Sequence, residues 1–267
     1  MGRSLTAPLP PPLPAPASQL VTIFILLQLK YGRKQTQATL CLVLPICSQS
    51  MDFHADKGCR LRVLRTRSLQ QISRMACHKS RGLIPVIVHN GKSVYESHVC
   101  IEYIDESWPN EPRLLPNDPY QRAKARMWGD FVSKKLIPPY YKFLVKQSPE
   151  EQSEGREQFL ANLLEFTKAM DPEGPFFLGK ELGYVDIMFA PWSYRIYILK
   201  HYRNFEIPQT DEYRRYHVWA EAVKNHPSVK PVQQEESRVL ADAKPYAEGN
   251  AKSELADAVR IKGKTIP

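Results

Sequence analysis

Two short motifs in the middle of the chain carry residue types that suit the binding of a charged ligand. In the first, an apolar stretch reaches Ile84 and is interrupted by Pro85. In the second, an acid and a hydroxyl, Glu96 and Ser97, stand where a helix is expected to begin. The start of a helix offers unpaired N–H groups and partial positive charge, which suit a carboxylate. A neighbouring acid suits an ammonium group, so the second motif fits a ligand that carries both charges.

Each motif also has a purely structural interpretation. A proline after an apolar residue often serves only at the edge of a strand or in a turn. A serine at a helix start can simply cap that helix. The two motifs are joined by a predicted hairpin around the turn pair Asn90-Gly91, and together they are more specific than either is alone.

The elements that must position these residues have the order β-α-β-α-β-β-α. Apolar or alternating sequence predicts strands over residues 38–44, 60–65, 84–88 and 93–95. Helices are predicted over residues 48–57 and 68–75. A further helix begins at Ser97 and is expected to bury Val99, Cys100, Tyr103 and Ile104. This order is that of a thioredoxin-like α/β domain, which we place over residues 37–107.

The second half of the chain is predicted to be helical. A proline-marked linker over residues 108–118 precedes an all-α domain over residues 119–246. Its first helix should run from Pro119 to about Leu136, where Pro138 and Pro139 kink or end it. Further helices are expected from Pro149 behind a Ser148 cap, from Gly183 with Asp186 closing a cap and Pro191 inside, and over residues 211–225 and 229–243. A proline-rich, basic leader (1–36) and a polar tail (247–267) flank the domains.

Charge and cysteine usage exclude several classes of function. The chain of 267 residues has a net charge of +9, but residues 1–82 hold 12 Lys or Arg against two Asp, and the remainder is near neutral. A basic front end of this kind indicates a solvated tail, so no nucleic-acid partner is predicted. No apolar run reaches the roughly 20 residues of a membrane-spanning helix. The five cysteines have no metal-binding spacing, and no metal is predicted.

The run from Arg81 to Ala123 resembles the omega class of glutathione transferases. Besides the two motifs, the match includes Glu102-Tyr103, Leu114-Leu115-Pro116 and Asp118-Pro119-Tyr120. The resemblance extends over roughly residues 38–245. It implies the glutathione-transferase fold, a thioredoxin-like domain followed by an all-α domain. It also implies glutathione as the cosubstrate, a cytoplasmic enzyme and a homodimer.

The resemblance assigns a role to several residues. A cis bond between Ile84 and Pro85 would present backbone groups to the cysteinyl part of glutathione. Ser97 would bind the γ-glutamyl carboxylate and Glu96 the ammonium group, and Gln71 stands where the family often has a lysine for the glycyl carboxylate. The acceptor, a small electrophile or a mixed disulfide, would lie between the domains. Its aromatic pocket would be formed by Trp192, Tyr140 and Tyr194.

The catalytic thiol is where the chain departs from the family pattern. The family places a cysteine, followed by a proline, at the start of the first helix, which lowers the pKa of the thiol. Counting back from Gly58 puts Leu44-Pro45-Ile46-Cys47 at this place, with Leu44 at the position of the nucleophile.

Three interpretations of this departure stay open. Cys47 or Cys41 acts after a small shift of register, or backbone dipoles and hydroxyls alone activate glutathione, or the first residues come from an alternative start or a mispredicted exon. Two functions follow: an omega-like transferase with thioltransferase or dehydroascorbate-reductase chemistry, or a non-catalytic glutathione-binding or scaffold protein.

Overall fold

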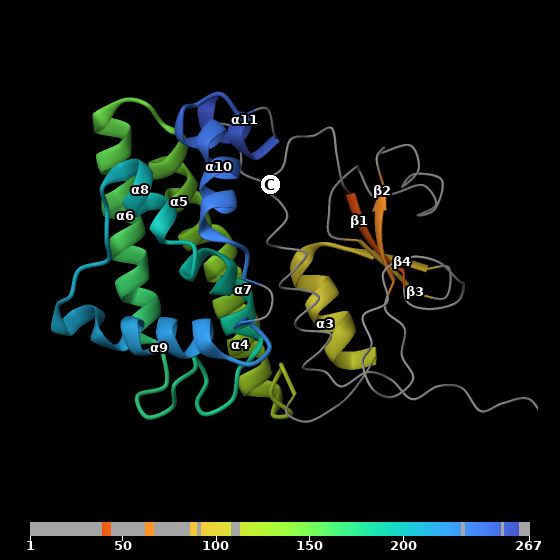
Figure 1. The fold of residues 1–267 in the computed structure, drawn as a ribbon. Coiled ribbons are helices and arrows are strands. Elements are labelled where there is room, and N and C mark those ends of the chain that lie inside the picture. The colour runs from red at the N-terminus through yellow and green to blue at the C-terminus, as the bar shows by residue number, and fades with distance from the viewer. Residues whose placement is uncertain are drawn as a thin grey trace, which may run out of the picture.

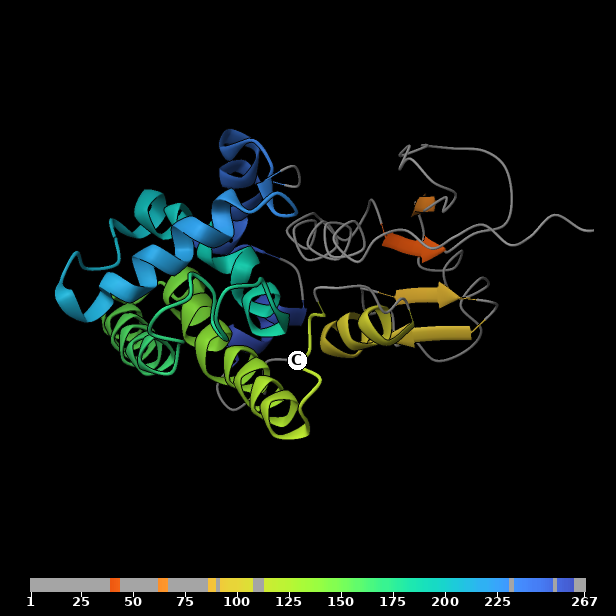
Figure 2. The same ribbon diagram turned by 90° about the horizontal axis from the view of Figure 1, so that it is seen from below.

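The chain forms an α/β part followed by an all-helical part (Figures 1 and 2), and this predicted arrangement is confirmed. The computed structural model describes residues 39–43, 62–66, 86–89, 92–107, 113–230, 233–251 and 254–261. The helices predicted over residues 48–57 and 68–75 lie outside this set. In both views, α3 is the described element of the α/β part that lies nearest to the helical part.

A four-stranded sheet, in the order β2-β1-β3-β4, forms the base of the α/β part. The strands are β1 (Thr39–Val43), β2 (Arg62–Thr66), β3 (Val86–His89) and β4 (Lys92–Tyr95). The predicted hairpin is confirmed, since β3 and β4 are antiparallel and His89 pairs with Lys92 across a two-residue connection. A β-α-β unit would make the first two strands parallel. Instead, β1 runs antiparallel to β2 and parallel to β3.

Helix α3 (Ser97–Ser107) follows β4 after a single residue and lies between the sheet and the helical part in Figure 1. It buries Cys100, Ile101, Ile104 and Asp105. The prediction that Val99 is buried is wrong, because the helix turns its Cys100 side inward and leaves Val99 40% exposed. Tyr103 is half-buried.

The helical part contains α4 (Pro119–Phe131), α5 (Ile137–Val145), α6 (Pro149–Lys168), α7 (Tyr184–Ser193), α8 (Tyr197–Arg203), α9 (Arg214–Asn225), α10 (Glu236–Ala247) and α11 (Glu254–Arg260). A π-helical turn, η2 (Val132–Leu136), joins α4 to α5, and a 3-10 turn, η3 (Asp211–Tyr213), precedes α9. Among the helices that the structure describes, none is both long and apolar enough to cross a membrane.

The predicted helix starts are confirmed at three places. The side chain of Asp118 accepts a hydrogen bond from the Gln121 N–H at 2.8 Å, and Pro119 is the first residue of α4. Ser148 accepts from the Glu151 N–H at 3.2 Å ahead of Pro149, the first residue of α6. At α7, Gly183 is the cap residue and donates to the Asp186 carboxylate at 2.8 Å. Each cap satisfies an N–H that the helix itself leaves unpaired.

Pro138 and Pro139 do not end the helical run, but a π-helical turn precedes them and interrupts the regular α-helix. Pro139 has no N–H to donate to the carbonyl of Lys135, four residues earlier. The Asn162 side chain on α6 donates to that carbonyl at 2.6 Å instead. The π-helical turn η2 takes up the change of pitch between α4 and α5.

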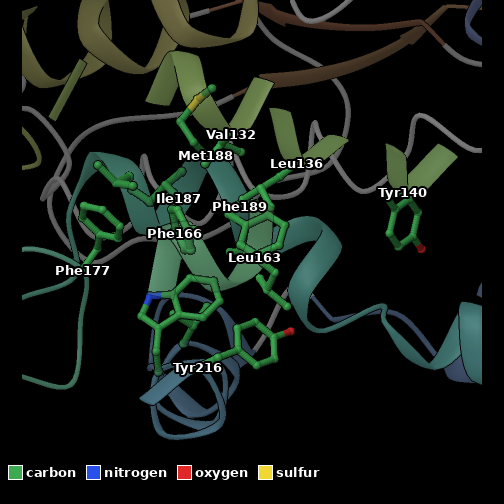
Figure 3. Close-up of a cluster of buried hydrophobic side chains, with 14 of the residues drawn as sticks. Val132, Leu136, Tyr140, Leu163, Phe166, Phe177, Ile187, Met188, Phe189 and Tyr216 are labelled. Atoms are coloured by element: carbon green, nitrogen blue, oxygen red, sulfur yellow. The ribbon is translucent and has the colours of Figure 1, made fainter. Parts of the chain in front are cut away.

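The core of the helical part is aromatic and continuous with the buried side of α3. Figure 3 shows Leu163, Phe166 and Phe189 close together at its centre. Trp219, which has no solvent exposure, stacks on Phe189 at 5.5 Å. Its indole N–H donates to Asp186 at 2.6 Å, so the same carboxylate caps α7 and binds the core residue Trp219.

Two predictions near the C-terminus are wrong. The helix expected over residues 229–243 begins only at Glu236. A proline ring disfavours the helical conformation of the residue before it, so a helix rarely continues through such a position. Val229 is buried in a separate turn over residues 227–230, which ends directly before Pro231. In the segment expected to be a tail, α11 buries Ala256, Ala258 and Val259.

Candidate functional site

Among the described residues of the candidate ligand site, the backbone is unusual at the junction of β4 and α3. Glu96 has a φ of 73°, in the left-handed region that residues other than glycine and asparagine rarely adopt. Its carbonyl accepts from the Cys100 N–H at 2.8 Å, which makes it the cap position of α3. Such backbone strain typically costs about 1–3 kcal/mol and clusters where ligands are held.

Ser97 is therefore the first residue of the helix rather than its cap residue. The first N–H groups of α3 have no acceptor within the helix and carry partial positive charge. Ser97 is half-buried and Glu96 is exposed. The arrangement offers a hydroxyl, N–H donors and a carboxylate within two residues, which suits a ligand that carries a carboxylate beside an ammonium group.

The sheet and the core fix this helix start from both sides. β4 ends at Tyr95, one residue before Glu96. On the helix side, the Cys100 thiol donates to the Val94 carbonyl at 3.6 Å, and Ile101 and Ile104 are buried. Glu96 thus lies between a hydrogen-bonded strand and a helix whose inner side is buried.

Ile84, Pro85 and Gln71, the other residues predicted to hold glutathione, lie outside the described residues. The register of the hairpin still relates the two motifs, since Val86, directly after Pro85, pairs with Tyr95, directly before Glu96. The described residues next to the two motifs, Val86 and Tyr95, therefore pair at one end of the hairpin.

The predicted thiols are only partly within the described structure. Cys47 lies outside the described residues, as does Leu44. Cys41 lies in the middle of β1, where its backbone pairs with Leu64 on one side and Val86 on the other. Cys100 is completely buried in α3.

The predicted aromatic pocket residues come from α5, from α7 and from the turn after α7. Tyr140 on α5 is 3% exposed and packs edge-on against Tyr141 and Phe159 at 5.4 and 5.9 Å. Trp192 at the end of α7 and Tyr194 in the turn after it are half-buried. Trp192 and Tyr194 have exposed surface for an acceptor, whereas Tyr140 lies behind the surface.

Arg195 is a cation in this region that the sequence analysis missed. Its guanidinium carbon lies 6.0 Å from the centre of the Tyr194 ring. Burial raises the pKa of Tyr197 to about 12, and the charge of Arg195 acts in the opposite direction. Burial also raises the pKa of Asp242 on α10, against the charges of Arg238 and Arg195. A lone basic residue within the aromatic run 192–197 was the available signal.

Comparison with known proteins finds glutathione S-transferases. A family model described as glutathione S-transferase, C-terminal domain, matches residues 149–222. Glutathione S-transferase U19 of Arabidopsis thaliana is 37% identical over 147 residues, which cover 54% of this chain and 64% of that protein. Glutathione S-transferase 3 of Glycine max is 31% identical over 159 residues, covering 58% of this chain and 70% of that protein.

Solved structures of two classes are similar to the chain. Glutathione transferase Omega 3C from Trametes versicolor is 32% identical with a TM-score of 0.57, covering 66% of this chain and 74% of that one. The Tau class glutathione S-transferase of mango, Mangifera indica, is 28% identical with a TM-score of 0.58, covering 67% and 80%. The predicted fold class is thereby confirmed, and both the omega and the tau class are represented among the similar structures. The chain spans slightly less than two thirds of U19.

Proposed function

Because this chain belongs to the glutathione S-transferase family, we propose that it binds glutathione at the start of α3 and transfers or exchanges it with a small acceptor. The observation that carries the proposal is the strained Glu96 directly before Ser97 at the first turn of α3. In this proposal, Ser97 and the helix N–H groups bind the γ-glutamyl carboxylate, and Glu96 binds the ammonium group. Ile84, Pro85 and Gln71 complete the glutathione site.

The acceptor in this proposal is a small electrophile or a mixed disulfide, held between residues 37–107 and residues 119–246. Trp192 and Tyr194 form its aromatic wall, and Tyr140 supports them from behind. Thioltransferase or dehydroascorbate-reductase chemistry of the omega type requires a thiolate, for which Cys47 and then Cys41 are the candidates. We place the protein in the cytoplasm, the compartment in which glutathione keeps thiols reduced.

A second candidate function is glutathione binding without turnover, as a scaffold of the same fold. Leu44 stands at the expected position of the catalytic cysteine. Cys100, the cysteine whose side chain the structure describes, is fully buried and therefore unsuited to attack a substrate. Both candidate functions share the glutathione site and differ only in chemistry.

The proposal includes a homodimer formed through α4. Tyr120 and Met127 are 72% and 71% exposed, and their spacing of seven residues puts them on one side of this helix. We infer that they belong to one apolar patch, since contiguous exposed apolar surface marks protein–protein interaction sites.

Calorimetric titration with glutathione tests the binding site directly. Ser97→Ala should weaken binding about tenfold to a hundredfold, because a hydrogen bond to a charged group is worth about 1.5–3 kcal/mol. Ser107→Ala, at the exposed far end of the same helix, is the matched control and should bind as the wild type does. Equal affinity in wild type and Ser97→Ala would contradict the site.

A thioltransferase assay separates the two candidate functions. Wild type, Cys47→Ser and Cys41→Ser are compared with a glutathione mixed disulfide as substrate. Loss of turnover in Cys47→Ser with glutathione affinity retained supports thiol chemistry at that residue. Glutathione binding without turnover of either a mixed disulfide or an aryl halide supports the scaffold function.

A further inference from the structure

Asp105 is a buried acid at the C-terminal end of α3, the helix whose other end begins at Ser97. Its side chain is 1% exposed. It accepts hydrogen bonds from the Arg113 guanidinium at 3.1–3.3 Å and from the backbone N–H groups of Leu114 and Leu115 at 2.9 and 3.4 Å. A negative charge is unfavourable at a helix C-terminus, and the last turn of α3 contains no basic residue. The contacts of Asp105 therefore stabilise the segment 113–115 after α3 rather than α3 itself.

Leu114 links Asp105 to the helical part by backbone hydrogen bonds on both sides. Its N–H donates to Asp105, and its carbonyl accepts from the Tyr184 N–H at 2.9 Å. Tyr184 is the first residue of α7. One buried residue thus joins the end of α3 to the beginning of α7 through its own backbone.

The far side of this connection is anchored in the core. Asp186, one turn into α7, accepts from the N–H groups of Gly183 and Phe177, both at 2.8 Å, and from Trp219 on α9. A second link between the parts, from Arg126 on α4 to Glu102 on α3 at 2.8 Å, is more exposed and therefore weaker. The buried path from Asp105 to α7 is thus the stiffer of the two links.

The helices joined here carry the two halves of the proposed site at their opposite ends. Ser97 begins α3 and Trp192 lies near the end of α7. Helices of this length extend about 15 Å, so a rotation of about 10° at the joint moves the far end by about 3 Å. A misplacement of about 1 Å between reactants can cost about a hundredfold in rate.

We propose that Asp105 is a positioning residue that fixes the placement of α3 relative to α7, and with it the distance between bound glutathione and the acceptor pocket. The expected effect of Asp105 on kcat rests on the proposed function, whereas its effect on the placement of the two helices does not. Glutathione affinity should be unaffected, because the glutathione groups lie at the other end of α3.

Distance measurement by pulsed electron paramagnetic resonance tests the placement without any activity. Bioorthogonal spin labels are placed at His98 on α3 and Lys200 on α8, both exposed. Asp105→Asn should shift or broaden the distance distribution. The matched control Glu106→Gln removes an exposed charge from the same helix end, together with its 4.0 Å ion pair to Arg126 of the weaker link, and should leave the distribution unchanged. An unchanged distribution in folded Asp105→Asn overturns the proposal.

Arg113→Gln is the second variant, in case Asp105→Asn fails to fold. Arg113 is 25% exposed, and its replacement leaves both backbone hydrogen bonds to Asp105 in place. It should broaden the same distribution to a smaller extent. A distribution identical to that of the wild type overturns the proposal as well.

Kinetics per glutathione-binding site then test the consequence. Asp105→Asn should keep the glutathione Kd within about twofold and lower kcat about tenfold, whereas Glu106→Gln changes neither. A role in stability alone would lower the number of binding sites and leave kcat per site unchanged, which would contradict positioning. If the wild type itself does not turn over, the proposed enzyme function fails, and the distance measurement still decides the role of Asp105.

Discussion

Asp186 has no solvent exposure and accepts hydrogen bonds from two backbone N–H groups and one indole. These three donors come from the loop before α7, the cap of α7 and α9. A buried acid with this set of partners organises the fold, as the sequence analysis expected, and has no exposed surface with which to reach a substrate. Its substitution should therefore affect folding rather than chemistry.

Asp186→Asn should lower the free energy of unfolding by about 2–3 kcal/mol at neutral pH. An asparagine amide has only one acceptor oxygen, so one N–H donor loses its partner and faces the new amide group. Urea denaturation measures the change, with Asp211→Asn, an exposed acid near the start of α9, as the control. A loss no larger than that of the control would contradict the role of Asp186.

The same variant should change the dependence of stability on pH. Burial raises the pKa of Asp186 to about 6, against about 3.9 in an unfolded chain. The folded state therefore binds this proton more tightly, so the contribution to stability is full below about pH 4 and is lost as the pH rises through 6. Asp186→Asn lacks this contribution. Its destabilisation relative to the wild type should be about 1 kcal/mol larger at pH 5 than at pH 7.5, by denaturation at each pH.

Tyr216 and Tyr213 form a matched pair of buried tyrosines. The Tyr216 hydroxyl has no hydrogen-bond partner among the described residues, whereas the Tyr213 hydroxyl donates to the Leu160 carbonyl at 3.1 Å. Tyr216→Phe should therefore be neutral or stabilise by up to about 1 kcal/mol, and Tyr213→Phe should destabilise by about 1 kcal/mol. Thermal unfolding of both variants checks this, and equal effects would contradict it.

At the scale of the elements, the π-helical turn η2 depends on a side chain from another helix. Asn162 on α6 replaces the donor that Pro139 lacks at the Lys135 carbonyl. Asn162→Ala should destabilise by about 1 kcal/mol, since it removes the hydrogen bond that joins α6 to this carbonyl. Asn225→Ala, which removes an exposed amide that donates to Glu221 within α9, should change stability by less than about 0.5 kcal/mol. Chemical denaturation compares the two variants, and a similar loss in both would contradict the role of Asn162.

Elements with a local signal could be predicted from the sequence. Asp118-Pro119, Ser148-Pro149 and Gly183 with Asp186 start helices because the cap and the helix lie within a few residues of each other. The hairpin between β3 and β4 likewise follows from its turn pair. The Glu96-Ser97 motif was found for the same reason, although its left-handed backbone was not.

Features that depend on tertiary contacts could not be predicted. Which side of α3 faces inward depends on its packing against β4 and the shared core, so the prediction for Val99 was wrong. Arg195 acquires its surroundings from an element distant in the sequence, since it lies near Asp242 of α10. The link from Asp105 to α7 passes through Leu114 and likewise depends on a contact with a distant element. The direction of β1 in the sheet is likewise decided by its partners and not by its own apolar pattern.

At the scale of the whole molecule, the proposed homodimer makes α4 a place where one charge should have a large effect. Met127→Glu puts a carboxylate on the proposed interface in both copies, where it would lose its hydration. Dimer association should weaken about tenfold or more, since the loss of a hot-spot contact costs about 2 kcal/mol or more. Sedimentation over a range of concentrations measures the dissociation constant. Val218→Glu adds the same charge to an exposed apolar site on α9 and should leave association unchanged. A wild-type monomer at every concentration, or equal dissociation constants for wild type and Met127→Glu, would exclude this face of α4.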